Sequence, residues 1–273
     1  MAINPINTNV GAQVGVQNLN RINRGLDTTQ NRISTGFKVN SAVDNAASFA
    51  IAAGISSDIG ALAAVSQGIG NAQGVATIAN AATTAISDQL GDLPATIVAA
   101  QNPGNTSQQQ AILQQDFQAQ VGQLNQVISS ASFNGTNLIS SGSANANVIA
   151  NTDGTTISIR GNGSVGDAVA ALATQNVTTI AGAQTALGTL NAANASVSTA
   201  LGNIGADTRA LGARDDFLDK LSTAQQIGLG SIRDADLARE AARNSAQRVQ
   251  QQLAVSTLNI ANARPASVAP LFR

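Results

Sequence analysis

The sequence lacks several residue types on which most enzymes and small secreted domains depend. Its 273 residues include no cysteine, histidine, tryptophan or tyrosine, and the 2% aromatic content is phenylalanine alone. The absence of cysteine excludes a disulfide framework and thiolate metal ligands, and the absence of histidine removes the commonest metal ligand and the usual general base near neutral pH. We therefore predict no enzyme activity, no catalytic residues, no cofactor and no metal site.

Large apolar side chains and concentrated charge are also scarce. Alanine makes up much of the 43% hydrophobic fraction, so thin, closely packed helices are favoured over a thick core. Net charge is −1, and no dense basic face with interleaved aromatics is present, which argues against a nucleic-acid partner. No apolar run is expected to reach bilayer length, and MAINPINTNV lacks a signal-peptide pattern, so we predict no membrane span and no Sec signal.

The C-terminal stretch, residues 231–273, is typical of a capped amphipathic helix. Asp234 or Asp236 is expected to cap its start, and Pro265 is expected to end it. A lone helix would leave its apolar seam in water, so this helix needs a partner. The seam follows alternating steps of four and three: Ala242, Ala246, Val249, Leu253, Ser256, Ile260 and Ala263.

The N-terminal stretch, residues 7–34, carries a matching seam, and Gly36 closes it. The two ends of the chain are therefore expected to meet as paired helices. The seam again advances by three and four residues: Ala12, Gly15, Leu19, Ile22, Leu26, Thr29 and Ile33.

The middle of the chain is predicted to be mostly helical. A long helix begins near Asp44 and should kink or end at Pro94, and a turn over 101–107 leads to a shorter helix. A second long helix follows, and Gly228 and Gly230 are expected to interrupt it before the terminal helix. Two apolar repeats define these last helices: Leu113, Phe117, Val121, Leu124 and Ile128 in the shorter one, and Leu187, Leu190, Asn194, Val197, Leu201, Ile204, Thr208, Leu211, Asp215 and Leu218 in the long one.

Two β-hairpins are predicted between these helices. SFNGTNLI turns at Asn134 and Gly135, and NVIANTDGTTISIRG turns at Asp153 and Gly154. Residues 141–179 are rich in Ser, Thr, Asn and Gly and are expected to form surface loops. The predicted fold class is mainly α: a long antiparallel helical bundle or coiled coil with paired terminal helices and a small β-hairpin region.

One motif invites a different interpretation. Gly161, Gly163 and Gly166 form a GxGxxG between a predicted strand and a predicted helix, as in dinucleotide-binding proteins. The next acidic residue after Asp167 is Asp207, which is too distant for the ribose contact of that fold. A loop before a helix capped by Asp167 is the favoured reading.

Five stretches of the sequence resemble bacterial flagellins, and the closing stretch is most similar to the short flagellins of alphaproteobacteria. They are INTNVGAQVGVQNLN (6–20), RISTGFKVNSAVDNAASFAIA (32–52), FNG (133–135), DADLARE (234–240) and LNIANARPASVAPLFR (258–273). The resemblance implies a structural subunit that is exported unfolded through the flagellar type III channel and polymerises under the filament cap. It implies an extracellular location in the flagellar filament, with terminal helices that pair as a coiled coil around a central channel.

The resemblance also implies partners and domains. The partners would be other copies of the same or a sister flagellin, the flagellar export apparatus, an export chaperone, the filament cap and hook-associated proteins. Residues 1–40 and 231–273 would form the filament core, 41–140 and 180–230 a helical rod with a β-hairpin, and 141–179 a short variable outer region. The assembly interface implied by the family comprises Leu19, Ile22, Leu26, Ile33, Val249, Leu253, Ile260, Leu271 and Phe272.

Two alternatives remain at this point. A hook-filament junction protein shares the terminal-helix plan, although DADLARE together with FNG favours a flagellin. A signalling coiled coil of the chemoreceptor type would need a membrane span or a docking domain, and the sequence predicts neither.

Overall fold

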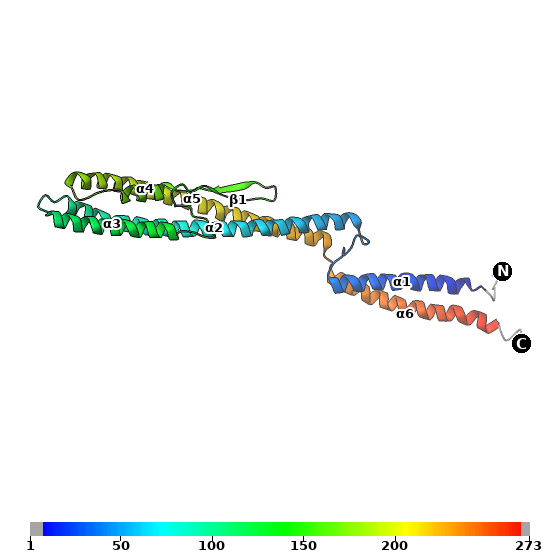
Figure 1. Cartoon of the computed structure of the whole chain (residues 1–273). Helices are drawn as coiled ribbons and strands as arrows, with labels where there is room; N and C mark the ends of the chain where they lie inside the picture. Colours follow the sequence, from blue (N-terminus) through cyan, green and yellow to red (C-terminus); the bar gives the residue numbers. More distant parts are fainter. Residues whose placement is uncertain (1–7, 269–273) are drawn as a thin grey trace. The chain divides into compact units, whose positions relative to one another are not determined.

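The computed structural model describes residues 8–268, which form six helices and one two-stranded antiparallel sheet (Figure 1). This architecture confirms the predicted mainly α fold class with a small β-hairpin region. The chain divides into two compact units, Met1–Ser57 with Ala224–Arg273, and Asp58–Thr223. The elements are α1 (Val10–Thr35), α2 (Ala46–Ala100), α3 (Ser107–Ser130), β1 (Ala146–Ile149), β2 (Thr156–Ile159), α4 (Ser164–Ala173), α5 (Ile180–Arg233) and α6 (Leu237–Val268).

The core of the Asp58–Thr223 unit is built on the apolar faces of α2, α3 and α5. The α3 face predicted from sequence is confirmed, because Phe117, Val121, Leu124 and Ile128 are all buried. On α2 between Leu62 and Ala100 a row of buried positions advances by three and four residues, as in a coiled coil, and Thr96 is buried beside it. The row consists of Leu62, Val65, Ile69, Ala72, Ala76, Ala79, Thr83, Ile86, Leu90, Leu93, Ile97 and Ala100.

Helix α5 uses only half of its predicted repeat for the core. The positions between the buried ones, such as Leu187 and Leu201, are half-buried, and alanines are buried in their place. Small side chains let neighbouring helices approach closely, so the core is thin and alanine-rich. The buried α5 residues are Ala183, Ala186, Leu190, Ala193, Val197, Ala200, Ile204, Leu211 and Leu218.

The predicted helix ends at Pro265 and at Gly228 and Gly230 are wrong, and at Pro94, where a kink or an end was predicted, the helix does not end. Helix α2 runs through Pro94 to Ala100, and α6 runs through Pro265 to Val268. At Pro94 the adjacent Leu93 and Ile97 are fully buried, and burial of such side chains contributes about 1.5–3 kcal/mol each, enough to offset the roughly 3 kcal/mol cost of an internal proline. Helix α5 likewise continues through Gly228 and Gly230 to Arg233.

The break between α5 and α6 lies instead at residues 234–236, where the α1–α2 connection contacts it. Gly36 ends α1 with a positive φ of 76°, and its carbonyl accepts a hydrogen bond of 2.9 Å from the Ala235 N–H. The Arg233 guanidinium lies 3.9 Å from the centre of the Phe37 ring. Asp236 caps α6 as predicted, because its Oδ1 accepts from the Arg239 N–H at 3.0 Å.

The predicted turns after α3 are confirmed, but only one of them closes a sheet. Phe133 and Thr136 exchange two backbone hydrogen bonds of 2.9–3.0 Å around Asn134 and Gly135, without flanking strands. Strands β1 and β2 pair antiparallel, with Ala146 opposite Ile159, and Gly154 has the positive φ of the connecting turn. The first segment is therefore a tight turn, and the second is a true hairpin.

The segment 141–179 is not a set of surface loops, so that prediction is wrong. It includes α4, and five of its apolar side chains are buried in the core. Its Ser, Thr and Asn residues lie between these buried apolar side chains. The average composition of the segment does not reveal that arrangement. The buried side chains are Ile159, Val165, Val169, Leu172 and Val177.

The GxGxxG segment owes its glycines to close backbone contact. A Cβ at Gly166 would lie 2.3 Å from the Ser141 nitrogen, and a Cβ at Gly161 would lie 2.4 Å from the Ser143 carbonyl oxygen. Residues 140–144 occupy the space that a side chain would need, so the loop interpretation is confirmed. Asp167 does not cap α4; it lies in the first turn and its carboxylate accepts a hydrogen bond from the Ser141 hydroxyl.

Helix α2 meets the length and composition of a membrane-spanning segment, so the expectation that no apolar run would be long enough is wrong for Ala46–Ala100. Alanine and isoleucine raise its hydropathy. A core helix can satisfy the same criteria, and α2 buries one full face against its neighbours. Only 17% of its apolar 18-residue window is buried within the chain, so this packing accounts for part of its apolar character.

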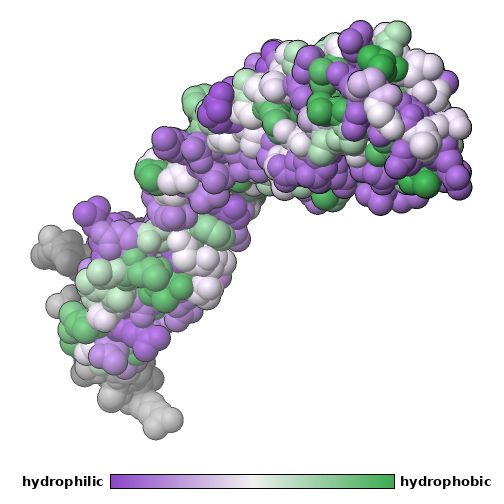
Figure 2. Space-filling view, turned by 90° about the vertical axis from the view of Figure 1, so that its left-hand side faces the viewer, coloured by the Kyte–Doolittle hydropathy of each residue, from purple (hydrophilic) through white to green (hydrophobic). Residues whose placement is uncertain are grey.

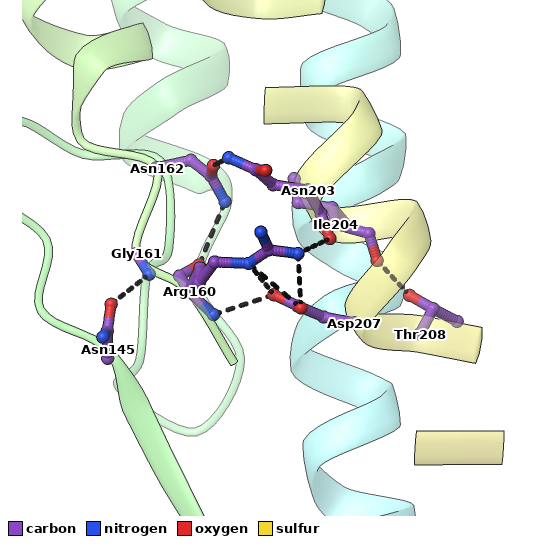
Figure 3. A network of polar contacts seen from close by, with 8 residues as sticks. All are labelled: Asn145, Arg160, Gly161, Asn162, Asn203, Ile204, Asp207 and Thr208. Atoms are coloured by element: carbon purple, nitrogen blue, oxygen red, sulfur yellow. Dashed lines mark hydrogen bonds and ion pairs between the residues drawn. The ribbon is translucent and has the colours of Figure 1, made fainter. Parts of the chain in front are cut away.

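A network of polar contacts holds the end of β2 on α5 (Figure 3). The Arg160 guanidinium donates to Asp207 from Nη2 at 2.8 Å and from Nε at 3.1 Å, and the Arg160 N–H donates to the same carboxylate at 2.9 Å. These hydrogen bonds to Asp207, together with its negative charge, raise the pKa of Arg160 above its ordinary value. Nearby, Asn203 donates to Asn162 at 3.0 Å.

Replacing Asp207 by asparagine should lower the thermal midpoint of unfolding by roughly 3–6 °C, because the neutral amide loses the paired acceptors that Arg160 uses. Circular dichroism at 222 nm would measure the shift. Asp216→Asn is the matched control, since Asp216 is exposed on the same helix. Equal midpoints for the two variants would contradict a stabilising role for this network.

Candidate assembly surface of the terminal helices

Helices α1 and α6 lie side by side and antiparallel (Figure 1). The α1 side of the contact is the predicted seam, with Leu26 buried and Leu19 and Ile22 half-buried. The α6 side is rich in polar side chains, which its apolar seam did not predict. Four hydrogen bonds follow the length of the pair: Arg32 Nη1 to Glu240 Oε1 at 3.2 Å, Thr29 Oγ1 to Gln247 Oε1 at 3.1 Å, Gln251 Nε2 to Asn23 Oδ1 at 2.7 Å, and Asn9 Nδ2 to the Ala261 carbonyl at 2.9 Å.

Two glycines allow the helices to approach closely. A Cβ at Gly25 would lie 2.6 Å from Gln247 Nε2, and a Cβ at Gly15 would lie 3.0 Å from Leu258 Cδ1. The α6 residues that are buried or half-buried in this unit form their own repeat of four and three, displaced by two residues from the predicted seam. They are Glu240, Asn244, Gln247, Gln251, Ala254, Leu258 and Ala261.

The expected pairing of the two apolar seams is therefore wrong on the α6 side. The side chains of Val249, Leu253 and Ile260 are 55%, 61% and 66% exposed. The buried or half-buried repeat of α6, here called the amide-rich stripe, donates and accepts the hydrogen bonds to α1. It therefore occupies the contact with α1 in which hydrophobicity alone would place the apolar stripe. The apolar stripe of α6 (Ala242, Ala246, Val249, Leu253, Ser256, Ile260 and Ala263) consequently remains exposed outside the contact with α1, and Leu253 borders the open groove between the two helices.

Glu240 provides the main charged contact of the pair. It is 6% exposed, and its Oε1 accepts from Arg32 at 3.2 Å and from Arg243 at 3.0 Å. Breaking a buried ion pair from one side leaves an uncompensated charge, so this cluster favours one alignment of α1 on α6.

The remaining predicted interface residues are divided among different environments. On α1, Leu26 is buried and Leu19 and Ile22 are half-buried, whereas Ile33 is 38% exposed. Leu271 and Phe272 lie outside the described residues. Sequence reasoning missed further exposed apolar residues beside the seams. Their β-branched or aliphatic side chains were the signal that could have identified them. They are Val10, Val14, Val16, Leu237 and Val255.

A groove of about 530 Å³ runs between the two helices. From α1 it is lined by Gly15, Asn18 and Ile22, and from α6 by Leu253 and Thr257. Figure 2 shows hydrophobic side chains exposed among polar ones on the terminal pair. Among residues 8–268 no group of three or more acidic side chains is arranged to hold a metal ion.

Family comparisons decide what kind of protein carries this surface. The model of the bacterial flagellin N-terminal helical region matches residues 6–145, and that of the C-terminal helical region matches residues 187–272. The chain belongs to the bacterial flagellin family. Flagellins are structural proteins, so this flagellin is a subunit of the flagellar filament and not an enzyme.

Individual relatives agree over the full length of this flagellin. Flagellin FljM of Caulobacter vibrioides is 34% identical, with 100% of both chains covered. A flagellin of Brucella melitensis is 32% identical, with 97% of this chain and 98% of the relative covered. These relatives confirm the resemblance to alphaproteobacterial flagellins and the extracellular filament as its location.

A solved structure with a related fold is described as a flagellar hook-associated protein from Vibrio parahaemolyticus. It has a TM-score of 0.58 and 15% identity, and the match covers 70% of this flagellin and 100% of that chain. At this identity the likeness concerns the fold alone. The hook-filament alternative therefore has less support than a filament subunit, which full-length relatives favour.

Proposed function

We propose that polymerisation of this flagellin buries the apolar stripe of α6 against neighbouring copies. The observation that supports this is the exposure of Val249, Leu253 and Ile260 on a helix whose amide-rich stripe already contacts α1. Large apolar side chains in water favour association, and each contributes about 1.5–3 kcal/mol when fully buried. Contact with other copies is the general property of the family; the contact residues are our proposal.

On α1, the same proposal has Ile33 contact a neighbouring copy. Leu19, Ile22 and Leu26 would instead pack within the α1–α6 pair and stabilise it. Leu271 and Phe272 would extend the interface at the C-terminus. In domain terms, residues 1–40 and 231–273 would form the filament core, 41–140 and 180–230 the rod, and 141–179 a short outer region that remains attached through its buried apolar side chains.

The export route and the remaining partners follow from family membership and belong to the same proposal. The flagellin would pass unfolded through the flagellar type III channel, escorted by an export chaperone, and join the filament under its cap next to hook-associated proteins. A chaperone would cover the apolar stripe of α6 before export, because an exposed stripe of this kind invites premature association.

The experiment that tests this function is an assembly assay with a chain that lacks residues 240–273. We expect the unchanged flagellin to form long filaments under assembling conditions, seen by electron microscopy, and the shortened chain to remain unassembled at the same concentration. Retained cooperative unfolding of the Asp58–Thr223 unit would show that the shortened chain still folds. Filaments of ordinary length from the shortened chain would refute the proposal.

A further inference from the structure

The chain contains two Asn-Gly pairs, and the structure places them in opposite environments. Asn134 and Gly135 form the exposed turn after α3, with positive φ values of 49° and 80°. In the part of the chain that the structure describes, no hydrogen bond engages the Asn134 carboxamide or the Gly135 N–H. Both groups are therefore accessible to solvent and to each other.

The second pair is Asn162 and Gly163, and Asn162 lies in the network of Figure 3. Asn162 is 3% exposed. Its Nδ2 donates to the Arg160 carbonyl at 3.0 Å, and its Oδ1 accepts from Asn203 Nδ2 at 3.0 Å. Its backbone N–H donates to the Leu138 carbonyl at 2.6 Å. The carboxamide is held at both ends and cannot turn without breaking these bonds.

We propose that Asn134 is a site of spontaneous deamidation in the folded protein and that Asn162 is protected. The Gly135 nitrogen loses its proton to water or hydroxide and attacks Cγ of Asn134. A C–N bond forms, the C–Nδ2 bond breaks, and ammonia leaves with a proton from solvent. Water then opens the cyclic imide at either carbonyl, which yields aspartate or isoaspartate. Glycine favours the attack because it has no Cβ to obstruct its nitrogen.

The modification would act on the contact between the turn and α2. The Phe133 ring lies against Gly74 of α2, where a Cβ would be only 3.1 Å from the ring. Isoaspartate adds a methylene to the main chain between Phe133 and Thr136, so their two hydrogen bonds cannot both persist. Each conversion also adds one negative charge to this uncharged turn and loosens the turn from α2.

The test incubates the full-length flagellin at mildly alkaline pH in ¹⁸O-labelled water and follows both peptides by mass spectrometry. We expect conversion at Asn134 at least about tenfold faster than at Asn162, because two hydrogen bonds and burial restrain the latter. A sample unfolded in urea should convert both at similar rates. Conversion of neither residue in the folded protein, or of both at equal rates, would overturn the proposal.

The variant Asn203→Leu supplies a matched control for protection. It removes the donor to Asn162 Oδ1 and leaves the turn at Asn134 unchanged. Conversion at Asn162 should rise severalfold while conversion at Asn134 stays constant, with circular dichroism confirming that the variant is folded. An unchanged rate at Asn162 would show that this hydrogen bond does not protect it and would overturn that part of the proposal.

Discussion

Replacing Leu253 by glutamate should abolish filament formation at concentrations at which the unchanged flagellin polymerises. Leu253 is 61% exposed in the single chain and lines the groove between α1 and α6, so the substitution has little effect on folding. In the polymer the glutamate would lose the roughly 1.5–3 kcal/mol of leucine burial and would also carry a charge out of water, which costs several kcal/mol more. The critical concentration for assembly should rise by more than about a hundredfold.

The control for this prediction is Gln252→Glu, which places the same charge one residue away. Gln252 is exposed on α6 and lines a polar depression with Asn23, Asp27 and Arg248. We expect this variant to assemble with a critical concentration close to that of the unchanged chain. Sedimentation at graded concentrations measures both values. Assembly by the Leu253 variant at its ordinary concentration would exclude the apolar stripe of α6 as an interface.

The sequence predicted the helices well because apolar repeats of three and four residues govern them directly. On α3, every residue from Phe117 to Ile128 that the repeat selected is buried. The proline rule failed at Pro94 because local propensity is worth only a few kcal/mol, whereas the buried neighbours on the same face contribute more together. Non-local packing of this kind cannot be calculated from a window of sequence.

The candidate interface was harder to predict because α6 carries two stripes with the same spacing. The rule that apolar residues face inward selected Val249, Leu253 and Ile260, whereas Gln247 and Gln251 in fact contact α1. That rule assumes that all burial occurs within one chain. Under the proposed function, the exposed apolar residues of α6 serve contacts with neighbouring copies, which a rule confined to one chain cannot anticipate.

A second limit concerns short segments with mixed composition. Between 141 and 179 the polar residues outnumber the buried anchors, and composition predicted loops. Ile159 and Val165 are buried because glycines at 161 and 166 bring the segment against residues 140–144. In the sequence, the glycines are the only sign of this close backbone contact. The GxGxxG pattern also occurs in other structural settings, so it does not identify the contact by itself.

Replacing Phe117 by alanine should destabilise the Asp58–Thr223 unit by about 3–5 kcal/mol, the usual range for removal of a buried phenylalanine. Phe117 is fully buried and is the largest such side chain in a core made mostly of aliphatic and alanine side chains. An alanine-rich core collapses poorly around a lost ring, because its small side chains have no flexible ends to fill the cavity. The measured quantity is the free energy of unfolding from urea titration of the full chain.

Phe217→Ala is the matched control, since it removes the same ring from an exposed position on α5. Phe217 is 50% exposed and lies 5.1 Å from the Arg214 guanidinium, a contact worth about 0.5–1 kcal/mol at an exposed site. We expect this variant to lose no more than that amount. A loss below about 1 kcal/mol for Phe117→Ala would show that the core does not depend on its one buried aromatic ring and that alanine packing alone sustains the unit.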